Sequence, residues 1–107
     1  MVKDLDRTFA ALADPTRRAI VARLAAGPRT VSELAAPLPM SLVAASKHIG
    51  VLARAGLVTR TKTGRTQVCR LHAEGLRDAS AWLDTYRDFW TARFDALASY
   101  LDEEDAR

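Results

Sequence analysis

The chain has 107 residues, enough for one hydrophobic core and too few for a two-domain enzyme, so we expect a single domain over residues 1–107. Apolar residues make up 49% of the sequence and charged residues 27%, a composition typical of soluble globular proteins. No apolar run approaches the roughly 20 residues of a membrane-spanning helix, and the first residues lack the apolar segment of a secretory signal. The lone cysteine, Cys69, excludes an internal disulfide, so we expect a cytoplasmic protein.

The net charge of +3 is unevenly distributed along the chain. Residues 34–73 contain six Lys and Arg residues and no Asp or Glu, whereas residues 74–107 contain four basic and nine acidic residues. A long segment without a carboxylate makes a positive surface. Such a surface suits a polyanion, DNA or RNA, better than it suits a carboxylate-based catalytic site.

The first third of the chain predicts two helices. An apolar stripe with helical spacing is formed by Leu5, Phe9 and Leu12. It predicts a short helix over residues 4–13. A second helix begins at Asp14 and Pro15, an N-cap residue followed by a proline in the first turn, and it ends at Gly27.

The next segment has the signals of two helices joined by a turn. Thr30 and Glu33 have the spacing of a capping box, which predicts a short third helix. The two prolines of residues 37–40 cannot continue that helix and predict a turn. Ser41 then caps a fourth helix that ends at Gly56, a residue suited to a left-handed C-terminal position.

The fourth helix is expected to bury one face and to expose the other. The positions expected inside are Leu42, Ala45, Ile49 and Leu52. The positions expected outside are Val43, Lys47, Gly50 and Arg54. This assignment follows from a rotation of about 100° per residue along an α-helix.

Beyond the fourth helix the hydrophobic period changes. Alternating β-branched residues over 57–62 and 66–71 predict two strands joined by a short loop at Gly64. From Ala73 an apolar stripe returns at helical spacing and predicts one helix of nearly thirty residues, which ends in the acidic segment 102–105. The expected fold is therefore mainly α with a small β-hairpin, a winged helix-turn-helix of five helices and a two-stranded wing.

Four segments of the chain resemble the ArsR-type family of bacterial winged-helix repressors. In chain order they are residues 12–20, 32–35, 46–58 and 64–65. The resemblance covers residues 5–101 and implies a homodimer that binds an imperfect palindrome in a promoter and leaves it when an effector binds. The aromatic C-terminal segment resembles the branch of this family that lacks metal sites.

The helix-turn-helix context selects the candidates for DNA contact. In this motif the second helix enters the major groove and the wing lies beside it, so small and polar groups on that helix can approach base edges. Cations at the hairpin tip reach phosphates easily, and a helix N-terminus offers free N–H groups. The candidates are Thr30, Ser32, Ser41, Val43, Ala44, Ser46, Lys47, His48, Lys62 and Arg65. The alternatives for these residues are a solvated helix face, ordinary turn chemistry and helix capping.

Both ends of the chain carry apolar stripes that a body of this size cannot cover. We expect these stripes to lack a partner within the chain and to pair across a two-fold axis, which also supplies the second half-site reader. The candidate interface residues are Leu5, Phe9, Leu12, Leu83, Tyr86, Trp90, Phe94 and Leu97. The alternative for the C-terminal stripe is an ordinary core.

We expect neither a metal nor another cofactor. The third helix has no cysteine, and residues 73–107 contain neither His nor Cys, the ligands that a transition-metal site needs. Cys69 is a redox sensor or, more commonly for a single cysteine, a small hydrophobe. The excess of large rings near the C-terminus suggests a hydrophobic small molecule or a lipid as the effector.

Three other functions are alternatives to a DNA-binding repressor. We expect no enzymatic activity, because the sequence has neither a nucleophile-elbow nor a phosphate-loop motif. An RNA-binding role fits the charge, but the aromatic residues are not interleaved with the basic ones. The remaining alternative is a protein-interaction module on a winged-helix scaffold without operator binding.

Overall fold

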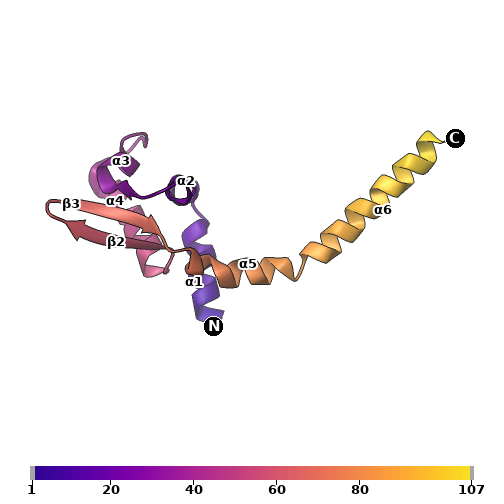
Figure 1. Cartoon of the computed structure of the whole chain (residues 1–107), viewed down its shortest axis with the longest axis horizontal. Helices are drawn as coiled ribbons and strands as arrows, with labels where there is room; N and C mark the ends of the chain where they lie inside the picture. The colour runs from indigo at the N-terminus through magenta and orange to yellow at the C-terminus, as the bar shows by residue number, and fades with distance from the viewer. Residues whose placement is uncertain (1, 107) are drawn as a thin grey trace.

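The computed structural model describes residues 2–106, with side chains from Leu5 onward. The elements in chain order are α1 (Val2–Leu12), α2 (Pro15–Ala25), β1 (Arg29–Thr30), α3 (Val31–Ala35), α4 (Leu42–Arg54), β2 (Val58–Thr63), β3 (Thr66–Leu71), the 3-10 helix η1 (Ala73–Leu76), α5 (Arg77–Asp84) and α6 (Arg87–Asp105). Helices α1 to α4 and the sheet form one body, and α6 projects away from it (Figure 1). The predicted winged helix-turn-helix fold is confirmed.

Side-chain caps begin three of the helices where the sequence predicted them. The carboxylate of Asp14 accepts a hydrogen bond from the Arg17 backbone N–H at 3.0 Å. Thr30 and Glu33 form both halves of the capping box, with N···O distances of 3.1 and 2.9 Å. The Ser41 hydroxyl accepts from the Ala44 N–H at 3.1 Å. These bonds satisfy N–H groups that the first helical turn leaves without a partner.

The sheet has three antiparallel strands in the order β1-β3-β2. The hairpin pairs Val58 with Leu71 at one end and Thr63 with Thr66 at the tip. The expected two-stranded wing is therefore extended by β1, whose two residues pair with β3. Hydrophobic periodicity could not reveal this strand, because two residues are too few to show alternation.

The core lies between α2, α3, α4 and the base of the hairpin. Its largest fully buried side chains are Ile20, Leu34, Ile49, Leu52, Leu57 and Cys69. On α4 the structure departs from the expected faces at two positions. Leu42 is 53% exposed instead of buried, because it lies in the first turn, beyond the part of the helix that the core covers. Gly50 is buried instead of exposed, because the Arg54 and Arg60 side chains lie over it.

The C-terminal segment is not the single long helix that the sequence predicted. The structure divides residues 73–105 into η1, α5 and α6, which we call the C-terminal arm. The break falls at Thr85, whose hydroxyl and backbone N–H both donate to the Trp82 carbonyl. A threonine that bonds the preceding turn competes with the helical hydrogen-bond pattern. Within residues 2–106 there are consequently six α-helices and one 3-10 helix in place of five helices.

Candidate DNA-binding surface

A groove of about 730 Å³ lies between the start of α3, the first half of α4 and the tip of the wing. We call it the central groove, and it is lined by Thr30, Val31, Ser32, Leu42, Val43, Ser46, Lys47, Arg65, Thr66 and Gln67. Six of the ten predicted contact residues are thus brought together from three separate segments. None of the described residues lining this groove is acidic.

The central groove combines cationic, apolar and hydrogen-bonding side chains, the kinds of groups that contact phosphates and base edges. Lys47 and Arg65 supply positive charge from α4 and from the wing. Val43 is 66% exposed, and Leu42 beside it is also exposed. Apolar groups of this kind can contact thymine methyl groups, while hydroxyl and amide groups exchange hydrogen bonds with bases and phosphates.

A second hollow adjoins the central groove and is more strongly basic. This basic hollow is lined by Ser46, Lys47, Gly50, Val51, Arg54 and Arg60. Lys47 lines both hollows. Arg54, Arg60 and the groove residue Gln67 were absent from the predicted contacts. The acid-free segment contains both arginines, but only the packing of β2 against α4 brings them together.

Four predicted contact residues lie outside the lining of the central groove. The Ser41 hydroxyl is occupied in capping α4, and Ala44 is half-buried. Lys62 is exposed on β2, opposite Gln67. His48 faces the start of α2, where its Nδ1 lies 3.3 Å from Arg17 Nη1 and 3.8 Å from Asp14 Oδ2.

Three titratable groups near this surface have displaced pKa values. The backbone N–H of Arg17 that bonds Asp14 holds the pKa of this carboxyl below its usual value. The backbone N–H and the hydroxyl of Thr30 lower the pKa of Glu33 in the same way. Burial raises the pKa of the Cys69 thiol, against a smaller opposing effect of Arg60. Cys69 is a free, fully buried cysteine in β3, an environment that keeps its sulfur protonated.

The candidate interface residues divide into two groups. Leu5, Phe9 and Leu12 on α1 are half-buried, and the Phe9 ring packs edge-on against Trp82 of α5 with centroids 5.5 Å apart. The expectation that the α1 stripe lacks a partner within the chain was therefore wrong. The candidates on the arm are all exposed, namely Leu83, Tyr86, Trp90, Phe94 and Leu97. Four further exposed apolar residues that the sequence analysis did not select are Trp82, Phe89, Tyr100 and Leu101.

Neither a metal-binding cluster nor a membrane-spanning helix is found in the described part of the chain. Among residues 5–106, whose side chains are described, no three or more His, Cys, Asp and Glu residues are grouped so that they could bind a metal ion. No helix in the same range is both long and apolar enough to cross a membrane.

Comparison with known proteins identifies the class of protein to which the chain is similar. A family model described as a helix-turn-helix domain matches residues 12–61. The chain is 46% identical over 99 residues to the HTH-type transcriptional regulator Rv2034 of Mycobacterium tuberculosis, covering 92% of this chain and 90% of that protein.

Two solved structures extend the comparison to the fold. A crystal structure of an ArsR family transcriptional regulator has a TM-score of 0.78 and 42% identity, covering 85% of this chain and 94% of that one. A solution structure of a homodimeric winged helix-turn-helix DNA-binding domain from Mycobacterium bovis has a TM-score of 0.66 and 30% identity, covering 81% of each chain. The chain belongs to the ArsR family of winged helix-turn-helix transcriptional regulators.

Proposed function

We propose that this protein is a homodimeric repressor that binds a palindromic operator through the central groove and the basic hollow of each subunit. The observation that carries the proposal is the convergence of α3, α4 and the wing on one surface whose described lining residues include no acid. The major groove of B-DNA admits one helix, and α4 is the helix that this surface presents. The chain then acts as a single domain in the cytoplasm, where it blocks transcription by occupying a promoter.

Each part of the surface has a role in this proposal. Ser46, Lys47 and Val43 face base edges, while Arg65 and Lys62 of the wing contact the backbone beside them. Thr30 and Ser32 place the N-terminus of α3 near a phosphate. Arg54 and Arg60 add phosphate contacts at the basic hollow. Phosphate contacts position the protein, and base contacts give the sequence preference.

The arm supplies the argument for a dimer. Helix α6 and its N-cap residue carry an exposed stripe at helical spacing, formed by Tyr86, Trp90, Phe94, Leu97 and Leu101. Within the described chain α6 meets only the end of α5, so this stripe has no cover of its own. A continuous exposed apolar stripe is typical of an interaction surface. A second copy of the chain offers an identical stripe that can pair with it across a two-fold axis.

The proposal is tested by fluorescence anisotropy with a duplex from the upstream region of its own gene and a scrambled duplex, over several salt concentrations. We expect selective binding of the first duplex, with a salt slope that rises by about 0.9 for each phosphate contact. Equal and weak binding to both duplexes, and to further candidate promoter duplexes, would favour the protein-interaction alternative. A non-metal effector is expected to raise the dissociation constant for the operator, and a chelator is expected to leave it unchanged.

A further inference from the structure

A third hollow, of about 630 Å³, lies where α1, α2 and the end of α4 meet. We call it the arginine hollow, and it is lined by Arg7, Ala10, Ala11, Arg17, Val51, Arg54 and Ala55. Three arginines thus surround a floor of alanine and valine. None of the described residues that line the hollow is acidic, although Asp14 lies close enough to Arg17 for their charges to interact.

The three guanidinium groups are not equivalent. That of Arg17 is held in place, since it donates to the Ala11 carbonyl at 2.6 Å and to the Ala10 carbonyl at 3.2 Å. Arg7 and Arg54 are exposed, and neither forms an ion pair with any residue whose side chain is described. Their donors are free to bind a ligand.

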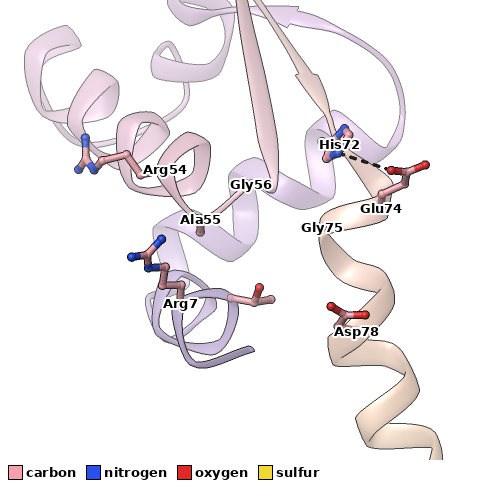
Figure 2. Close-up of a pocket in the computed structure, with 9 residues that line it drawn as sticks. Arg7, Arg54, Ala55, Gly56, His72, Glu74, Gly75 and Asp78 are labelled. Carbon is pink, nitrogen blue, oxygen red and sulfur yellow. Dashed lines mark ion pairs between the residues drawn. The ribbon is translucent and has the colours of Figure 1, made fainter. Parts of the chain in front are cut away.

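Figure 2 shows a neighbouring hollow of about 390 Å³, which shares Arg7, Arg54 and Ala55 with the arginine hollow and lies at the same junction of α1 and α4. The two arginines lie on one side of the junction. The acidic side chains Glu74 and Asp78 lie on the other side, with the former paired to His72. The positive charges thus face away from the only carboxylates that line this neighbouring hollow among the described residues.

We propose that the arginine hollow binds a small organic anion with an apolar body, such as an aliphatic monocarboxylate, and that this anion is the effector of the repressor. The carboxylate lies between Arg7 and Arg54, because guanidinium groups bind carboxylates with paired, charge-assisted hydrogen bonds. The aliphatic body covers the floor formed by Ala10, Ala11, Val51 and Ala55. Hollows of several hundred Å³ with an apolar floor and a few placed polar groups are typical of small-ligand sites.

Arg54 connects this site to DNA binding, a step that rests on the proposed function. The residue lies in the last turn of α4 and also lines the basic hollow beside Lys47 and Arg60. A carboxylate bound to Arg54 neutralises a charge that would otherwise meet a phosphate. Saturation of both subunits with the ligand therefore weakens operator binding. It lowers the salt slope by about 1.8, because one phosphate contact of about 0.9 is lost in each subunit of the dimer.

The site is tested first on the free protein, without DNA. Isothermal titration calorimetry with hexanoate is compared with hexan-1-ol, hexylamine and acetate, which remove the charge, reverse it or remove the apolar body. We expect binding of hexanoate alone among the four. Arg7→Gln is expected to weaken it about tenfold, the effect of losing one charge-assisted hydrogen bond. Arg77→Gln, an exposed arginine of α5 that does not line the hollow, serves as the matched control and is expected to change nothing.

Two results would overturn the site: hexanoate binding no better than hexan-1-ol, or Arg7→Gln behaving like Arg77→Gln while both variants keep the wild-type circular dichroism spectrum. The second stage repeats the operator titration with and without hexanoate. Hexanoate is expected to release the wild-type protein and to act only weakly on Arg7→Gln. If hexanoate binds but operator affinity does not change, the regulatory role is wrong while the site remains. If no duplex is bound, the proposed function fails and the calorimetry still decides the site.

Discussion

Among the described residues, Lys47 is the one cation that lines both the central groove and the basic hollow. It is exposed, projects from the middle of α4, and forms no ion pair with the described residues. Its charge is therefore fully available to a phosphate or to a base edge. The side chain has no part in the core, so its substitution tests the surface without disturbing the fold.

Lys47→Glu is expected to abolish operator binding while the dimer is retained. The substitution deletes one phosphate contact in each subunit, two for the dimer, and the two new negative charges repel the DNA backbone. Anisotropy measures the affinity, and sedimentation velocity measures the oligomeric state. The matched control is Arg77→Glu, the same charge reversal on α5. This residue lines neither the central groove nor the basic hollow, so the variant is expected to keep nearly full operator affinity. Unchanged affinity of the Lys47 variant would contradict the assignment of α4 as the recognition helix.

Asp14 contributes to stability through the N-cap of α2. Because its pKa is lower in the folded chain than the usual value, the carboxylate stabilises the folded state above the unfolded pKa, and this contribution is lost as the pH falls through the folded pKa. Asp14→Asn keeps a capping acceptor and removes the ionisable group. We expect the variant to lose less stability than the wild type below about pH 4, near the ordinary aspartate pKa. Urea unfolding at pH 7 and pH 3 measures the difference, and identical losses in both proteins would exclude this role.

At the scale of the elements, the joint between the body and the arm depends on one close approach. An ideal Cβ on Gly75 of η1 would collide with the backbone carbonyl of Gly56 and would lie 3.1 Å from Leu57 Cδ2. The absence of a side chain thus lets η1 rest directly on the turn that follows α4. This contact joins the start of the arm to the turn at the end of α4.

Gly75→Ala is expected to lower the free energy of unfolding by about 1–3 kcal/mol, the usual cost of forcing atoms into a packed contact. It should also weaken operator binding, because the shifted arm changes the separation of the two α4 helices in the dimer. Thermal unfolding and anisotropy measure the two effects. Glu74→Ala, an exposed neighbour, is the control and is expected to be near neutral. A variant as stable as the control would mean that the turn relaxes without cost.

At the scale of the whole molecule, the chain is extended. Its radius of gyration is 19.0 Å, and it measures 68 × 32 × 20 Å. A compact chain of this length would have a radius of gyration of about 13 Å. The difference comes from α6, which stands clear of the body with its aromatic stripe uncovered (Figure 1). An uncovered apolar stripe of this kind is typical of a surface that another molecule covers.

Phe94→Glu is expected to shift the protein to a monomer at concentrations where the wild type is a dimer. A charge placed in an apolar interface loses solvation without gaining a partner. Operator affinity is expected to fall when the dimer is lost, because a single subunit contacts only one half-site. Ala92→Glu adds the same charge on the opposite face of α6 and is expected to leave the dimer intact. Sedimentation velocity measures whether each variant is a monomer or a dimer. An equal effect of Phe94→Glu and Ala92→Glu on the oligomeric state would contradict an interface along this stripe.

Short-range signals in the sequence were sufficient for the helix-turn-helix. Asp14, Thr30 and Ser41 cap their helices as predicted, because a cap is made within three or four residues of the chain. The hairpin follows for the same reason, since a short loop brings its two strands together. Six of the predicted contact residues met in the central groove because the order of these elements determines their packing.

Long-range packing decided the remaining features. β1 exists only because β3 offers it a free edge, and Arg54 and Arg60 meet only because β2 packs on α4. The break of the C-terminal helix is a local exception. The hydrophobic period runs through Thr85 and predicts a continuous helix, but the hydroxyl and the N–H of Thr85 both bond the Trp82 carbonyl where the helix is interrupted. The interior position of Gly50 depends in part on Arg60, which the strand β2 brings over it, and Leu42 is exposed because the body does not extend over the first turn of α4. Periodicity reports which side chains are apolar, whereas only the assembled body determines which of them it is large enough to cover.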